Sequence, residues 1–117
     1  MKKRTVTKIS DLQLKPFDRY GKPIPKLSWH PISYDKKNGH GSYILKFEAG
    51  GKSLEHKHLG SEEFLVLEGS LKDSDNTEFK AGDFVTFEPG SSHFSTSDKG
   101  CLLLVFMRGI NEQIKQN

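Results

Sequence analysis

Closely spaced turn signals divide this 117-residue chain, from residue 28 onward, into short segments. Turn-forming residues cluster at DKKNGHG, AGGK, DSDN, KAGD and EPGSS, and no segment between these clusters has a convincing 3.6-residue apolar period. The segments are rich in aromatic and branched residues, which is typical of strands. The sequence therefore predicts an all-β sandwich or barrel, with any helix confined to the termini. The expected strands are 29–34, 42–48, 62–68, 77–79, 84–87 and 102–107.

The length fits one domain and leaves no room for a second. Residues 1–27 contain three prolines and few alternating apolar positions, so they are expected to form an N-terminal arm. Residues 28–108 are then the single barrel domain, and residues 109–117 a C-terminal tail. No apolar run approaches membrane-spanning length, and the basic opening MKKRTVTKIS lacks the apolar stretch of a secretory signal. These features predict a cytoplasmic protein without a membrane partner.

Charge and cysteine content limit the partners and the thiol chemistry that the chain is expected to have. The 18 basic and 15 acidic residues give a net charge of +3, and the lysines are spread along the chain instead of forming a basic stripe. Nucleic acid is therefore not an expected partner. The single cysteine, Cys101, cannot form an internal disulfide, and its apolar neighbours in GCLLLVFM predict a buried packing thiol.

Alternation of side chains predicts which strand faces are buried. In SYILKFE, the charges at Lys46 and Glu48 mark the outer face, so the inward residues are predicted to be Tyr43, Leu45 and Phe47. The segment CLLLVFM is apolar on both faces, and an apolar outer face should not remain in contact with water. We therefore expect a homodimer, although the N-terminal arm could cover this face instead.

The stretch EHKHLGSEEFLVLEGS, residues 55–70, places ionisable side chains directly beside a predicted core strand. His56 and His58 alternate, so on a strand they share a face with their Cα atoms roughly 6.6 Å apart and can converge on one metal ion. In EEFLVLE, both faces of the predicted strand begin with a glutamate, Glu62 or Glu63, and continue with apolar residues. Whichever face is buried, one glutamate must therefore point inward. A buried charge of this kind requires a compensating partner, and a metal ion is the one expected.

Two motifs in this region resemble those of the cupin superfamily. The first is Gly50, five residues, His56, Lys57, His58, three residues, Glu62, six residues, Gly69. The second is GDFVTFEPGSSH, with Gly82, Pro89, Gly90 and His93. Together they span roughly residues 50–97, and their order and separation make the pair far more specific than either motif alone.

The second motif departs from the cupin pattern in two places. Glu88 stands where cupins commonly have proline, two positions before the second glycine, and proline follows it. Ser97 occupies the position at which cupins often have asparagine. These departures affect the expected detail of the turn but leave the placement of His93 unchanged.

The resemblance implies a small double-stranded β-helix, the cupin jelly-roll barrel, that holds one divalent metal ion. The implied ligands are His56, His58, Glu62 and His93. Imidazoles with one carboxylate suit iron, manganese, nickel, cobalt or zinc, and they exclude an all-oxygen calcium site. An ion that takes five or six ligands would keep positions open for water, dioxygen or a substrate, whereas tetrahedral zinc would not.

Each of these interpretations has a plainer alternative. His30 and His40 are expected to be surface or hydrogen-bonded residues, and Glu63 a carboxylate at the rim or surface. Several aromatic side chains could line a substrate pocket, but in a small barrel they are more often core residues. These are Tyr43, Phe47, Phe64, Phe87 and Phe94.

Within the cupins, residues 28–108 most resemble the ChrR-like group, through EEFLVLEG, DSDN, PGSSH and GCLLLV. That group includes sensory domains of zinc anti-sigma factors and proteins similar to acetylacetone-cleaving dioxygenases. Because no histidine or cysteine precedes His30, the helical zinc domain that grips a sigma factor is not expected. Two functions remain open, a metal-dependent dioxygenase of a small dicarbonyl or related metabolite and a non-catalytic metal-centred sensor, and in either a small molecule is the expected partner.

Overall fold

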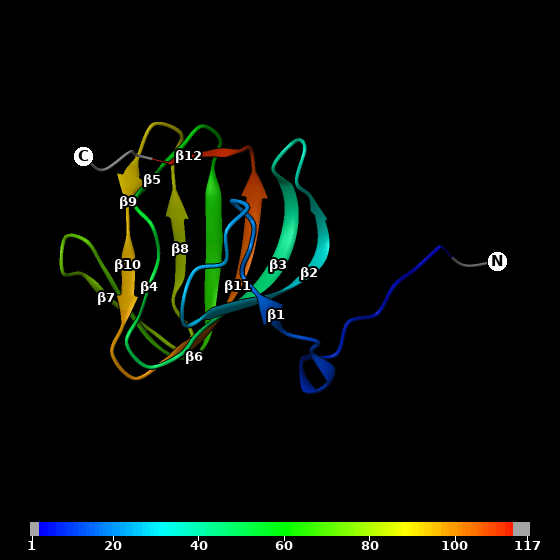
Figure 1. Cartoon of the computed structure of the whole chain (residues 1–117), viewed down its shortest axis with the longest axis horizontal. Coiled ribbons are helices and arrows are strands. Elements are labelled where there is room, and N and C mark those ends of the chain that lie inside the picture. The colour runs from blue at the N-terminus through cyan, green and yellow to red at the C-terminus, as the bar shows by residue number, and fades with distance from the viewer. Residues whose placement is uncertain (1–2, 114–117) are drawn as a thin grey trace.

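The computed structural model describes residues 3–113, which fold into two antiparallel sheets (Figure 1). The larger sheet has the order β1-β2-β3-β11-β6-β10-β4, with β7 and β8 also paired to β6, and the smaller has the order β12-β5-β9. The strands are β1 Lys15–Pro16, β2 Leu27–Asp35, β3 His40–Phe47, β4 Gly51–Lys52, β5 His56–His58, β6 Glu62–Asp73, β7 Glu78–Lys80, β8 Phe84–Phe87, β9 Ser92–His93, β10 Ser95–Ser97, β11 Cys101–Arg108 and β12 Asn111–Gln113.

The all-β prediction is confirmed, and each of the six predicted segments contains a strand. Within residues 3–113 the only helix is the single 3-10 turn Ile9–Asp11, near the N-terminus as expected. No helix in this part of the chain is long and apolar enough to cross a membrane. Among the described residues, six short strands lie outside the expected segments, because two or three residues give little room for an alternating pattern: β1, β4, β5, β9, β10 and β12.

The core lies on the concave face of the curled sheet, and its residues follow the predicted alternation. Tyr43, Leu45 and Phe47 on β3 are only 3%, 7% and 2% exposed, as expected. The N-terminal segment also contributes, because Phe17 packs edge-to-face on Trp29 with ring centroids 5.1 Å apart. Burying one such side chain stabilises the fold by about 1.5–3 kcal/mol, so this segment is anchored to the barrel.

Strand β11 divides its apolar residues between the two faces. Its inward residues are buried, namely Cys101, Leu103, Val105 and Met107, which confirms Cys101 as a packing thiol. On the outward face Leu104 and Phe106 are half-buried. The ring of Phe84 on β8, which is 55% exposed, lies 6.4 Å from that of Phe106. An apolar patch of Phe84 and Phe106 thus remains open on the outer face.

The N-terminal arm covers another part of the outer surface. The Gln13 amide donates a hydrogen bond to His30 Nδ1 over 3.0 Å, and Leu12 and Leu14 line a groove together with Leu102. His30 is thus hydrogen-bonded and His40 is exposed, as predicted. Figure 1 shows the chain before this groove extending away from the barrel.

Two glycines let the C-terminal strand reach the small sheet. A Cβ atom on Gly60 would lie 2.3 Å from the carbonyl oxygen of Arg108, and one on Gly109 would lie 2.7 Å from the Cα of Gly60. Only glycine therefore permits this close crossing. The chain then continues into β12, which places Asn111 directly opposite His58 on β5.

Candidate metal centre

The structure brings together the four residues predicted to bind metal. His56 and His58 lie on β5, His93 lies on β9, and Glu62 is the first residue of β6. His56 and His93 form a direct cross-strand pair, and all four side chains are buried. One candidate ligand atom from each residue lies within 4.8 Å of all the others. This buried group of three histidines and one glutamate can hold a metal ion.

The parity of β6, which the sequence left open, is decided by its packing. Phe64 and Val66 are 2% and 1% exposed in the core, so Glu62 shares their inward face and is itself only 7% exposed. Glu63 lies on the opposite face, where its carboxylate pairs with Arg108 at 2.9 Å and accepts a hydrogen bond from Thr86. Glu62 therefore joins the histidines, and Glu63 forms a surface ion pair.

Hydrogen bonds at the outer ring nitrogens fix the tautomers of His56 and His93. The Leu54 carbonyl oxygen only accepts, so His56 Nδ1 donates to it over 2.9 Å. His93 Nδ1 donates over 2.7 Å to the carboxylate of Asp73. With the proton on Nδ1, each ring directs Nε2, the nitrogen left to bind a metal, toward the centre of the cluster.

His58 adopts the same tautomer through Ser91. The Ser91 hydroxyl donates its only hydrogen to the Glu88 carbonyl over 2.7 Å, and therefore accepts from His58 Nδ1 over 2.8 Å. The turn containing Ser91 is itself fixed to β5, because the His58 amide donates to the Ser91 carbonyl over 2.8 Å. The EPGSS turn thus orients the side chain of His58 on β5.

The separations within the cluster suit a transition metal. His56 Nε2 and His58 Nε2 are 3.1 Å apart, and Glu62 Oε2 contacts His58 Nε2 and lies 3.6 Å from His56 Nε2. His93 Nε2 is buried without a hydrogen-bond partner in the described part of the chain. Two ligand atoms about 2.1 Å from an ion and at right angles are about 3.0 Å apart. A cation bound among these electron-pair donors would compensate for their mutual repulsion.

Electrostatics within the cluster keep the glutamate ionised. Burial alone would raise the pKa of Glu62, but its interactions with His56 and His58 outweigh burial and lower that pKa far below its ordinary value. For His56, burial favours the neutral ring, but Glu62 outweighs it and raises the pKa. The centre therefore contains one permanent negative charge among histidines, which is suited to a divalent cation.

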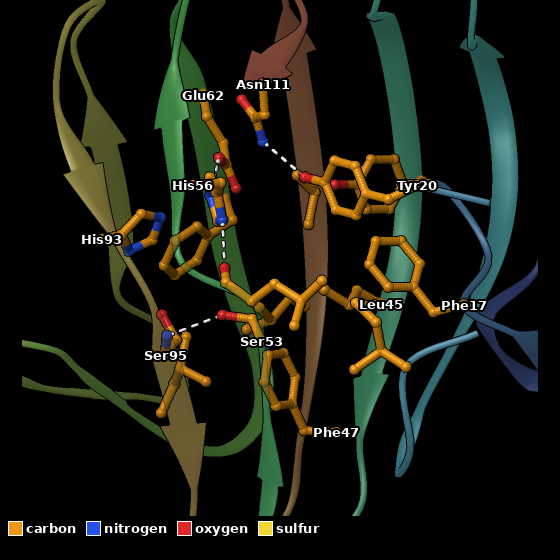
Figure 2. A pocket seen from close by; sticks show the side chains of 17 residues that line it. Phe17, Tyr20, Leu45, Phe47, Ser53, His56, Glu62, His93, Ser95 and Asn111 are labelled. Carbon is orange, nitrogen blue, oxygen red and sulfur yellow. Dashed lines mark hydrogen bonds and ion pairs between the residues drawn. The ribbon is translucent and has the colours of Figure 1, made fainter. Parts of the chain in front are cut away.

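A small cavity opens beside the cluster, as Figure 2 shows. His56, Glu62 and His93 line one part of it, and most of the remaining wall is apolar. Its volume of about 40 Å³ is enough for about three water molecules, so it suits a ligand of a few heavy atoms. Three of the five aromatic pocket candidates from the sequence both belong to the core and line this cavity, namely Tyr43, Phe47 and Phe64.

The other two aromatic candidates, Phe87 and Phe94, do not line the cavity. Phe87 stacks against His93 with ring centroids 4.1 Å apart, and Phe94 lies under the Lys52 ammonium. Sequence reasoning did not identify Asp73 or Ser91, which orient two of the histidines, or Tyr20 and Asn111, which line the cavity. No local pattern indicates the roles of these residues, because each role depends on contacts between segments that are distant in the sequence.

Comparison with known proteins identifies the family of this chain. The family described as the ChrR cupin-like domain matches residues 2–111. The chain belongs to this family. No curated protein sequence matches it.

Solved structures show the same cupin fold. An RmlC-like cupin from Ralstonia eutropha has a TM-score of 0.79 at 18% identity, covering 96% of this chain and 73% of that chain. An acetylacetone dioxygenase from Acinetobacter johnsonii has a TM-score of 0.75 at 16% identity, with coverage of 100% and 84%. The complex of SigE with the anti-sigma ChrR from Rhodobacter sphaeroides gives 0.67 at 19% identity, with coverage of 86% and 50%. At these identities the likeness establishes the jelly-roll fold of this ChrR-like cupin.

Proposed function

We propose that this ChrR-like cupin holds one divalent transition metal ion with His56, His58, Glu62 and His93, and binds a small oxygen-chelating molecule at that ion. Iron, manganese, nickel, cobalt and zinc all suit this ligand set. The observation that carries the proposal is the convergence of three imidazole nitrogens and one carboxylate oxygen beside a cavity. Glu62 leaves a net charge of about +1 around a divalent ion, which favours an anionic enolate, dicarboxylate or 2-oxo acid.

We further propose that the metal-loaded protein is a dioxygenase of a small dicarbonyl or related metabolite. When bound, the metal would polarise the oxygens of the substrate and supply the redox chemistry needed for dioxygen. The chain itself fixes the imidazole orientations through Asp73, Ser91 and the Leu54 carbonyl, and its apolar wall keeps the bound molecule away from bulk water. The likeness to the Acinetobacter johnsonii enzyme supports this proposal at the level of the fold.

A second candidate is a metal-centred sensor that binds a ligand or responds to an oxidant without turnover. The likeness to the anti-sigma ChrR of Rhodobacter sphaeroides supports it, and this chain spans half of that chain's length. The sensor would use the same cavity and the same ligand set. The two functions differ only in whether a bound molecule is transformed.

Three measurements test the proposal. Elemental analysis of the purified protein should give about one transition metal ion per chain. The double variant with His56→Ala and His93→Ala should contain no bound metal. Oxygen-electrode traces with dicarbonyl compounds should then show consumption by the iron(II) form but not by the zinc form. Unchanged metal content in the double variant would refute the site. Spectral shifts of the cobalt form with ligand, without oxygen consumption by the iron, nickel or manganese form, would leave the sensor in place of the dioxygenase.

A further inference from the structure

Two residues from opposite ends of the chain meet at the wall of the cavity. Tyr20 belongs to the N-terminal segment and Asn111 begins β12, and Asn111 Nδ2 donates to the Tyr20 hydroxyl oxygen over 3.1 Å. Figure 2 shows the Asn111 side chain between Glu62 and Tyr20. The sequence separation between these two residues is 91, so only the folded barrel brings them to the same site.

This pair keeps unused hydrogen-bonding capacity. The Tyr20 oxygen accepts from Asn111, so its own hydrogen remains available to a ligand. Asn111 Oδ1 is buried and has no hydrogen-bond partner among residues 3–113. Buried acceptors are rarely left unpaired in native proteins. The Tyr20–Asn111 pair therefore offers one donor and one acceptor to a molecule in the cavity.

Packing holds both side chains in place. The Arg19 guanidinium lies 4.7 Å from the Tyr20 ring centroid and 5.3 Å from that of Tyr34, and its Nε donates to the Tyr34 hydroxyl. Asn111 is held by pairing of β12 with β5, where it lies opposite His58. Burial raises the pKa of Tyr20, which keeps its phenol protonated as a donor. The pair is thus preorganised before any ligand arrives.

We infer that Tyr20 and Asn111 are specificity-determining residues that bind a hydroxyl or enol group of the ligand, while the opposite end of the ligand binds the metal. This inference rests on the proposed function, because it requires a ligand at the metal. A hydroxyl both donates and accepts, so it satisfies the pair, whereas a methyl group in its place would leave both polar groups unpaired. The donor and acceptor of this pair, together with the small volume of the cavity, indicate the class of ligand. It is a short 2-oxo acid or dicarbonyl compound that carries a hydroxyl or enol.

Two probes of matched size test the inference, namely 3-hydroxypyruvate and 2-oxobutanoate, which differ in a terminal hydroxyl against a methyl group. Dissociation constants are measured on the cobalt(II)-loaded protein from its visible absorption. We expect the parent protein to bind hydroxypyruvate about ten-fold more tightly. Tyr20→Phe keeps the ring against Arg19 and should remove most of this preference, without weakening 2-oxobutanoate binding and without changing metal content.

Tyr34→Phe is the matched control, because Tyr34 also contacts Arg19 but does not line the cavity, and it should keep the preference. Asn111→Leu provides a second route if Tyr20→Phe does not fold, with the same expected loss. Equal binding of the two probes by the parent protein would overturn the inference while leaving the metal site intact. An unchanged preference in both Tyr20→Phe and Asn111→Leu would do so too. Failure of the metal-loaded parent to bind either probe would instead overturn the proposed 2-oxo acid function and, with it, this inference.

Discussion

The contact between Asp73 and His93 predicts that a residue outside the ligand set controls metal affinity. The Asp73 side chain is 10% exposed and its carboxylate lies 2.7 Å from His93 Nδ1. Ser95 Oγ donates to the same oxygen over 3.4 Å, which helps to fix the carboxylate. A charge-assisted hydrogen bond in this position holds the imidazole and increases the basicity of its Nε2.

Two substitutions separate charge from geometry. Asparagine at position 73 can still accept from His93 Nδ1 but lacks the negative charge, so we expect Asp73→Asn to weaken metal binding about ten-fold. Asp73→Leu removes the acceptor as well, and we expect a loss of about a hundred-fold. These changes correspond to about 1.4 and 2.7 kcal/mol of binding free energy.

Competition with a chromophoric chelator measures cobalt or zinc affinity, and melting of the metal-free protein reports any purely structural damage. Asp75→Asn is the control, since Asp75 lies in the same hairpin and accepts from the Thr77 amide but makes no contact with His93. Its metal affinity should equal that of the parent protein. If both Asp73 variants also bind metal like the parent protein, while His93→Ala does not, Asp73 has no role in the site.

Three further predictions follow from burial and charge. Glu62→Gln should weaken metal binding far more than Glu63→Gln in the same chelator competition, because only Glu62 faces the histidines, and equal losses would contradict this. Burial raises the pKa of the Cys101 thiol to about 11 from an ordinary 9.0. At pH 8 the folded protein should therefore hold about a hundred-fold less Cys101 thiolate than the unfolded chain. Iodoacetamide should therefore alkylate it at least that much faster in urea, and comparable rates would refute the burial. The exposed Phe84 and Phe106 patch predicts a homodimer, so light scattering at micromolar concentration should give twice the mass of one chain, and a clean monomer would refute it.

The sequence alone was sufficient to predict the structural features that depend on local periodicity. Alternation with a period of two identified β3 and its inward Tyr43, and the turn clusters separated the strands. The spacing of His56 and His58 was enough to place both on one face of a strand. These inferences succeeded because a side chain's direction on a strand depends only on its neighbours in sequence.

Tertiary structure decided everything that depends on which strands pair. Alternation alone does not distinguish Glu62 from Glu63, although the cupin motif spacing implied Glu62, and it is the packing of β6 against the core that turns Glu62 toward the histidines. Asp73 and Asn111 carry no local mark of their roles, yet they meet His93 and Tyr20 over separations of 20 and 91 residues. Such contacts arise from sheet closure, in which many weak interactions across the whole barrel select one register. No short stretch of sequence encodes that register, so the supporting residues of the site emerge only in the folded chain.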